Sequence, residues 1–283
     1  MDDIEIYEYR RLDLRDSFII DGFPSVGLVS TITASYIVAA LDMELIGVMD
    51  SVYFPTVSVI RDGEPHHPVR FYAGDLEGPD GDWTRLVVFL SEFQPPSNLI
   101  KMICNSVLDW AEEQKCSCLI SPEGLVIEGE NPQPNGGQSD DDEGEQEDQG
   151  SIQVQNMTLP PPTGEKSVYG LSSTPSGKDR LQKAKVSIFP EGLISGIPGV
   201  LLNEGKKRNF EVTCLLAEAH DNIPDARAAA GIIEVLKGII PYLEIDLAPL
   251  YAEADLLEAK MRGYQKISKP GGKKTIPSPS MYG

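Results

Sequence analysis

The sequence predicts an α/β protein with a mainly parallel sheet and helices on both faces. Short apolar, β-rich runs alternate along the chain with longer segments of helical periodicity. The run Arg85–Leu90 is apolar with almost no alternation, which is typical of a strand covered on both faces. A hydrophobic fraction of 41% in 283 residues allows a substantial buried core. Strands separated by helices imply crossover connections and therefore parallel neighbours.

In the first half, a helix is expected to follow the turn Gly22–Gly27 and to run to about Leu41. A second helix opens at Pro95-Pro96-Ser97 and carries apolar residues at helical spacing. Strands are expected over residues 17–21, 44–49, 53–60, 85–90 and 116–120.

The second half repeats this rhythm, with strands over 167–171 and 211–216. Helices are expected from Thr174 to about Ala184, from Gly196 onward, and after Asp225, which is a good capping residue. A last amphipathic helix over 247–262 completes a single domain, residues 1–265. Its apolar stripe either packs on the domain or mediates self-association, and comprises Leu247, Leu250, Tyr251, Ala254, Leu257 and Met261.

Two segments do not fit this α/β pattern. Residues 130–165 are rich in Gly, Pro, Gln and acid, with seven carboxylates between Asp140 and Asp148, and are expected to form a disordered insertion. A docking site for a basic partner is the alternative. Residues 266–283 are rich in Pro, Gly and Lys and are expected to form a flexible tail. The cations at this end, with no acid among them, are Lys260, Arg262, Lys266, Lys269, Lys273 and Lys274.

Charge and composition exclude several functions. A formal net charge of -20 argues against nucleic-acid binding. The N-terminus lacks a secretory signal, and the apolar stretch Val26–Leu41 is too short and too polar to span a membrane. We therefore expect a cytoplasmic protein. Its four cysteines are expected to be buried thiols, with Cys116 and Cys118 on one side of a strand, and no metal or cofactor site is expected.

One feature resembles an enzyme. Ser25 lies on the strand-to-helix turn Phe23–Gly27, where a hydrolase nucleophile elbow would lie, and His220 follows far downstream. The bulky Phe23 breaks the elbow pattern, and no Asp stands out as an orienting acid. We expect Ser25 to bond a free N–H at the helix start and His220 to bond within its own turn. A Ser25 hydrolase, or a phosphorylase-like protein with a small molecule at the strand ends, remains the alternative function.

The chain ends in Met281-Tyr282-Gly283. A hydrophobic residue, a tyrosine and a terminal residue resemble the C-terminal motif by which proteasome activators and assembly chaperones enter pockets of the proteasome α-ring. Capture of a free carboxylate also requires an extended tether, which the preceding residues supply. These three residues are the predicted partner-binding site.

Six segments of the domain carry a further resemblance: Gly22–Val29, Pro122-Glu123-Gly124, Tyr169-Gly170, Gly196–Leu202, Glu218-Ala219-His220 and Pro224–Ala229. On these residues the domain, from about Ser17 to Ile245, resembles the proteasome assembly chaperone family in its archaeal branch. The resemblance implies a three-layer α/β/α fold related to nucleoside phosphorylases, homo-oligomers, binding to proteasome α-subunits, and no catalytic activity. The acidic insertion and the terminal Gly283 depart from the family pattern.

Overall fold

Four strands from the two halves of the chain lie side by side at the centre of one sheet. They are β7 (Trp83–Ser91), β2 (Phe18–Ile20), β8 (Cys118–Leu125) and β11 (Glu211–Glu218), and each is parallel to its neighbour. This computed structural model describes residues 4–126, 168–220 and 223–256. The parallel centre confirms the crossover connections predicted from the alternating strands and helices.

The flanks of the nine-stranded sheet are mainly antiparallel, so the sheet as a whole is mixed. Its order is β1-β3-β6-β7-β2-β8-β11-β9-β10. Beyond β7 lie β6 (Val69–Glu77), β3 (Glu44–Asp50) and β1 (Glu5–Glu8), all antiparallel. Beyond β11 lie β9 (Val168–Ser172), antiparallel to β11, and β10 (Ser187–Ile188), parallel to β9.

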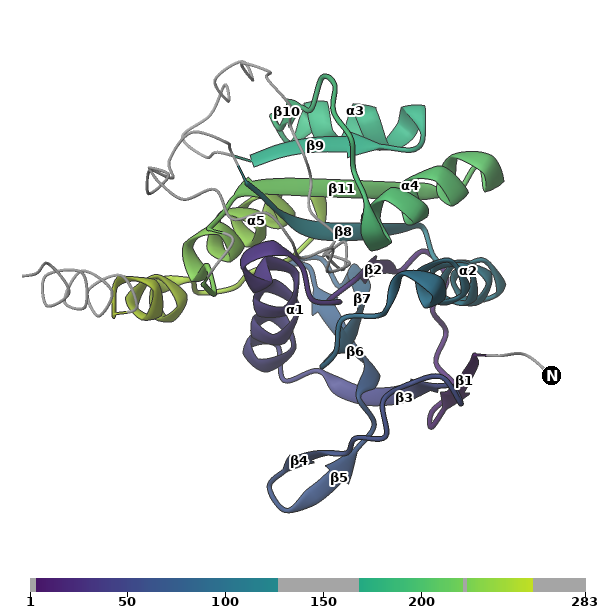
Figure 1. Cartoon of the computed structure of the whole chain (residues 1–283). Coiled ribbons are helices and arrows are strands. Elements are labelled where there is room, and N and C mark those ends of the chain that lie inside the picture. Colours follow the sequence, from purple (N-terminus) through teal and green to yellow (C-terminus); the bar gives the residue numbers. More distant parts are fainter. Residues whose placement is uncertain (1–3, 127–167, 221–222, 257–283) are drawn as a thin grey trace, which may run out of the picture.

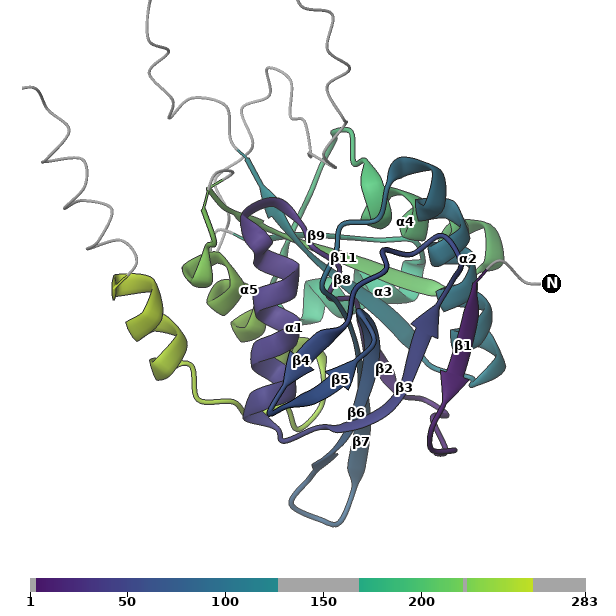
Figure 2. The ribbon, with the colours of Figure 1, turned by 60° about the horizontal axis from the view of Figure 1, so that its bottom comes forward.

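Helices cover both faces of the sheet, which gives three layers (Figures 1 and 2). One face packs against α1 (Val29–Ala40) and α5 (Ala226–Ile239), and the other against α2 (Ser97–Glu113) and α4 (Gly196–Arg208). A shorter helix, α3 (Pro175–Lys183), contributes Leu181 to the cluster of α1 and α5. The three-layer arrangement is the one that the family resemblance implied.

Side chains of the central strands are buried on both faces. Ile19 and Leu119 pack toward α2 and α4, whereas Ile20 and Ile120 pack toward α1 and α5. All four are fully buried. Burial of such a side chain contributes about 1.5–3 kcal/mol to stability. This two-sided burial explains why these strands are continuous apolar runs in the sequence.

The strand expected over residues 53–60 is wrong. The chain leaves the main sheet after Asp50, and only β4 (Val59–Arg61) is extended, paired with β5 (Glu64–His66) in a separate two-stranded sheet. The strand that instead belongs to the main sheet is β6, which the sequence pattern did not identify. β-rich composition favours an extended chain, but the available partner strand decides which segment joins a sheet.

Part of the final apolar stripe packs on the domain. Residues 248–256 are helical, and Leu247, Leu250 and Ala254 are buried in the cluster that contains α1 and α5. Asp255 also pairs with Arg227 at 2.6 Å. The remainder of the expected helix 247–262, with Leu257 and Met261, lies outside the described residues, as do the insertion 130–165 and the tail 266–283.

All four cysteines are free and buried. Burial raises the pKa of Cys116 to about 11 and that of Cys118 to about 12. The two were expected on one side of a strand, but Cys116 packs toward α2 and Cys118 toward α1 and α5. The reason is that β8 begins only at Cys118, so the alternation of a strand does not include Cys116.

Candidate functional site

The carboxyl end of β2 holds a buried acid. Asp21 is 2% exposed, and it accepts hydrogen bonds from the backbone N–H of Phe23 at 3.1 Å and from Ser121 Oγ at 2.5 Å. These bonds join the exit of β2 to the middle of β8. Burial raises the pKa of Asp21 to about 6, although both hydrogen bonds favour the charged form.

A second acid, Glu123, lies further along β8 and is also buried. Burial, followed by the negative charge of Asp21, raises the pKa of Glu123 well above its usual range. Among the described residues, no cation lowers the pKa of either carboxyl. Sequence reasoning did not select this pair as a site, although an acid directly after an apolar strand and another within an apolar run were visible signals.

Ser25 lies on the loop that follows Asp21. Its backbone is extended, with φ -132° and ψ 179°, and its Oγ accepts a hydrogen bond from the backbone N–H of Ser30 at 3.0 Å. The predicted bond to a free N–H at the start of α1 is therefore present. A nucleophile elbow places its serine on a sharp, strained turn, whereas here the left-handed residues are Gly27 and Leu28.

His220 bonds within its own turn, as predicted. Its Nδ1 lies 2.7 Å from Oδ2 of Asp225, whose Oδ1 caps α5 by accepting the N–H of Ala228 at 2.9 Å. The orienting carboxylate that the sequence did not reveal is thus Asp225. No hydrogen bond between Ser25 and His220 is found among the described residues.

The loops that carry Ser25 and His220 are joined to each other. The backbone N–H of Asp225 donates to the carbonyl oxygen of Gly27 at 2.8 Å. Gly27 has φ 60°, and a Cβ there would lie 2.8 Å from the carbonyl oxygen of His220. Only glycine adopts this conformation readily at such close approach, so Gly27, His220 and Asp225 form one rim at the carboxyl edge of the sheet.

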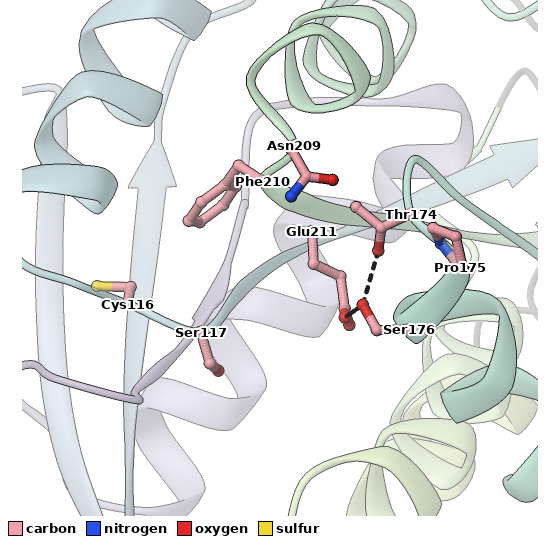
Figure 3. A pocket seen from close by; sticks show the side chains of 8 residues that line it. All are labelled: Cys116, Ser117, Thr174, Pro175, Ser176, Asn209, Phe210 and Glu211. Carbon is pink, nitrogen blue, oxygen red and sulfur yellow. Dashed lines mark hydrogen bonds between the residues drawn. The ribbon is translucent and has the colours of Figure 1, made fainter.

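A pocket of about 530 Å³ lies at the opposite, amino edge (Figure 3). Glu211 at the start of β11 accepts hydrogen bonds from Ser176 Oγ at 2.8 Å and from Arg180 Nε at 3.0 Å, and Ser176 also bonds Thr174. The polar groups of this pocket are largely bonded to one another, which attaches α3 to β11. Its lining residues are Cys116, Ser117, Thr174, Pro175, Ser176, Asn209, Phe210 and Glu211.

Within residues 4–126, 168–220 and 223–256, no three or more His, Cys, Asp or Glu side chains converge as metal ligands would. No helix in the same ranges has the length and apolar character needed to cross a membrane.

The predicted docking residues Met281, Tyr282 and Gly283 lie outside the described residues. The described part of the chain ends at residue 256. Asp255, in the last described turn, pairs with Arg227 in the first turn of α5. The first turn of α5 follows the rim formed by Gly27, His220 and Asp225, so this last described turn lies beside the carboxyl edge of the sheet.

Known proteins resemble this chain over most of its length. A protein of Pyrococcus furiosus, PbaA, described as an archaeal homolog of proteasome-assembly chaperone, is 25% identical, with a TM-score of 0.70 and coverage of 93% of this chain and 92% of that one. PbaB of the same organism, described as an archaeal proteasome activator, shares the fold at 22% identity, with a TM-score of 0.69 and coverage of 94% and 100%. An uncharacterized protein of Methanocaldococcus jannaschii is 21% identical over 93% of this chain and 91% of its own length.

The family model provides the assignment. The model of the PAC2 family matches residues 19–265, which begin within β2 and include every later strand of the main sheet and both helical layers. This range agrees with the resemblance to proteasome assembly chaperones that the glycine- and proline-containing segments carry. This protein therefore belongs to the PAC2 family.

Proposed function

We propose that this protein is a proteasome assembly chaperone or activator that docks onto α-subunits through Met281-Tyr282-Gly283. The observation that carries the proposal is the combination of a PAC2 domain with the residues Met281-Tyr282-Gly283, a hydrophobic residue, a tyrosine and a last residue as in the docking motif. PbaA, described as an archaeal homolog of proteasome-assembly chaperone, and PbaB, described as an archaeal proteasome activator, support it. The proposal places the protein in the cytoplasm, together with its target.

Each residue of the tail has a distinct role in this mechanism. Met281 enters an apolar patch of the α-subunit. Tyr282 packs beside it and donates a hydrogen bond through its hydroxyl group. The carboxylate of Gly283 pairs with a lysine in the pocket. Because Gly283 has no side chain, its contribution is limited to the backbone and the terminal charge.

The tether suits a docking end. The segment Lys269–Gly283 reaches about 45 Å when it is extended like polyproline. The cations between Lys260 and Lys274 are followed by no acid, whereas the whole chain carries a formal charge of -20. A basic tether on an acidic body is steered toward an acidic rim, and electrostatic steering raises the rate of association.

Several tails must act together. A three-residue contact is weak, because binding must order the tether. A homo-oligomer presents several tails to one ring, and each tail that binds raises the effective concentration of the next. In a closed symmetric ring, all tails leave from equivalent positions. We therefore propose self-association as part of the function.

Binding rather than catalysis is also favoured by the bonds at the carboxyl edge. Ser25 Oγ accepts the N–H of Ser30, and His220 is bonded to the carboxylate that caps α5. Both groups of the alternative hydrolase have local structural partners. The two loops carry these bonds in a rim that holds α1 and α5 in place.

A pull-down from native cytoplasm tests the proposal. The baits are the intact protein, a protein lacking Met281, Tyr282 and Gly283, and a control in which Met281 and Tyr282 are exchanged. The control keeps composition and length but puts the aromatic ring in the wrong position. Recovery of α-subunits with the intact protein alone is expected. Equal recovery with all three baits would show that the tail is not the docking element.

A further inference from the structure

A hairpin projects from the body of the molecule between β3 and β6 (Figures 1 and 2). Residues 52–66, here called the arm, contain β4 and β5, which pair only with each other. An isolated two-stranded hairpin is only marginally stable in water. Its apolar side chains are nevertheless exposed: Val52 at 90%, Tyr53 at 54%, Val57 at 54% and Ile60 at 64%. Neighbouring exposed apolar side chains of this kind mark a contact surface.

The arm is held in a defined orientation. Arg70 of β6 is fully buried and donates to Glu92 Oε1 at 2.5 Å and to the carbonyl oxygen of His67 at 2.6 Å. The same Glu92 oxygen accepts a hydrogen bond from Arg61 of the arm at 3.0 Å. Because an unpaired buried charge is costly, Arg70 fixes Glu92, and Glu92 fixes the arm.

An aromatic contact anchors the other end of the arm. Phe54 is buried, and its ring packs edge-on against Phe93 with the ring centroids 5.1 Å apart. The arm thus turns one aromatic ring inward while Val52, Tyr53 and Val57 on either side of it face solvent. The fold presents an apolar surface rigidly, as pre-organised contact surfaces require.

Charge selects the partner. The run from Val52 to Ile60 contains no Asp, Glu, Lys, Arg or His, although the chain has 68 Asp, Glu, Lys and Arg residues and a formal charge of -20. Another copy of this chain is equally acidic, so two copies approach at least cost along this uncharged run, which the charged residues Arg61, Asp62 and Glu64 of the arm only follow. A basic partner would instead bind more favourably to the acidic surface of the rest of the chain.

We infer that the arm is a self-association surface, and that Val52, Tyr53, Val57 and Ile60 pack against a second copy of this chain. The inference rests on the proposed function for its role, because self-association supplies the several tails. The location of the surface is inferred from the exposed apolar side chains of the arm and from the contacts that anchor it.

Light scattering over a concentration series tests the surface with the full-length chain. The arm variant combines Val57→Asp and Ile60→Asp. The matched control combines Ile188→Asp and Leu193→Asp, two exposed aliphatic residues of β10 and the loop after it. The midpoint concentration for association should rise by about tenfold or more in the arm variant only, since a loss of 1.4 kcal/mol corresponds to tenfold. Unchanged association of the arm variant, or a monomeric intact protein at micromolar concentration, overturns the inference.

Thiol labelling gives a second measurement, which detects the contact between copies without breaking it by a charged substitution. All four native cysteines are buried, so an introduced surface thiol is the accessible one. With Ile60→Cys, maleimide labelling should be slow at high protein concentration and fast after dilution. With Leu193→Cys it should be fast in both conditions. Equal labelling of Ile60→Cys at both concentrations would place the interface elsewhere.

These experiments separate the arm from the tail. Deletion of Met281, Tyr282 and Gly283 should leave the molar mass unchanged, since the arm is intact. If that deletion abolishes α-ring binding while the arm variant keeps its mass, the proposed function stands and the arm inference fails. If the arm variant dissociates but the tail deletion does not affect α-ring binding, the arm inference stands and the proposed function fails.

Discussion

Asp21 and Glu123 are carboxyl groups that the fold holds away from water, and within the described part of the chain no cation lowers the pKa of either. Asp21 has two hydrogen-bond donors, and burial still raises its pKa to about 6. Desolvation therefore outweighs the two bonds. The acid is retained at a position where it joins the exit of β2 to Ser121 of β8, which orients the loop that carries Ser25.

This predicts a specific pH dependence of stability. The pKa of Asp21 rises from 3.8 to about 6 on folding, so between these values the native state binds more protons than the unfolded state. The free energy of unfolding should therefore fall as pH rises through this window, by about 3 kcal/mol at most. Urea unfolding from pH 4 to pH 8 measures it.

The matched variants for this measurement are Asp21→Asn and Asp80→Asn. The first removes the titrating group but keeps an acceptor for the N–H of Phe23. The second removes one exposed carboxylate in the loop between β6 and β7. Asp21→Asn should flatten the loss of stability with rising pH relative to Asp80→Asn. Identical pH profiles for both variants would refute the assignment.

Ser25→Ala tests the structural role of the hydroxyl group. It removes the acceptor of the Ser30 N–H and should lower the free energy of unfolding by about 1 kcal/mol. Ser35→Ala is the control, because Ser35 donates only to carbonyl oxygens within α1 and should have little effect. An esterase activity that Ser25→Ala abolishes would instead support the hydrolase alternative.

At the scale of elements, local pattern predicted the parallel centre well; on the flanks it predicted β3 and β9 but missed β1, β6 and β10. The runs that became β2, β7, β8 and β11 are apolar on both faces, so their burial is visible in the sequence. The segment 53–60 has comparable β-forming residues but contains Pro55, and it has no partner strand in the main sheet. Pairing is a tertiary property, and a local pattern does not contain it.

Each buried acid was visible in the sequence as an acid in or directly after an apolar run, but the contact of Asp21 across the sheet was not predictable, for the same reason. Asp21 and Ser121 are 100 positions apart and meet only because β2 pairs with β8. By contrast, the bonds of Ser25 and His220 were predictable, because each partner lies five positions along the chain. Short-range capping is readable from sequence, whereas contacts across the sheet require its strand order.

Limited proteolysis tests the organisation of the elements around the insertion. Cleavage should occur first between Glu130 and Glu165, where the composition predicts disorder. The two fragments should stay associated, because β8 from the first pairs with β11 from the second and α1 packs against α5. Uniform resistance of this segment, measured by mass spectrometry of the fragments, would count against a disordered insertion.

At the scale of the whole molecule, the proposed mechanism joins an acidic domain to a basic tail whose terminal carboxylate docks. The central claim is that α-ring binding requires the free end of Gly283. The most direct measurement compares equilibrium binding of purified α-rings by the intact protein, a protein lacking Met281, Tyr282 and Gly283, and a protein with one residue added after Gly283. The addition displaces the carboxylate while every side chain stays in place. Tight binding by the intact protein alone is predicted, with Tyr282→Ala weakened by about 2 kcal/mol or more. Equal binding by the intact, deleted and extended proteins would contradict the account and move the docking surface to the α/β domain.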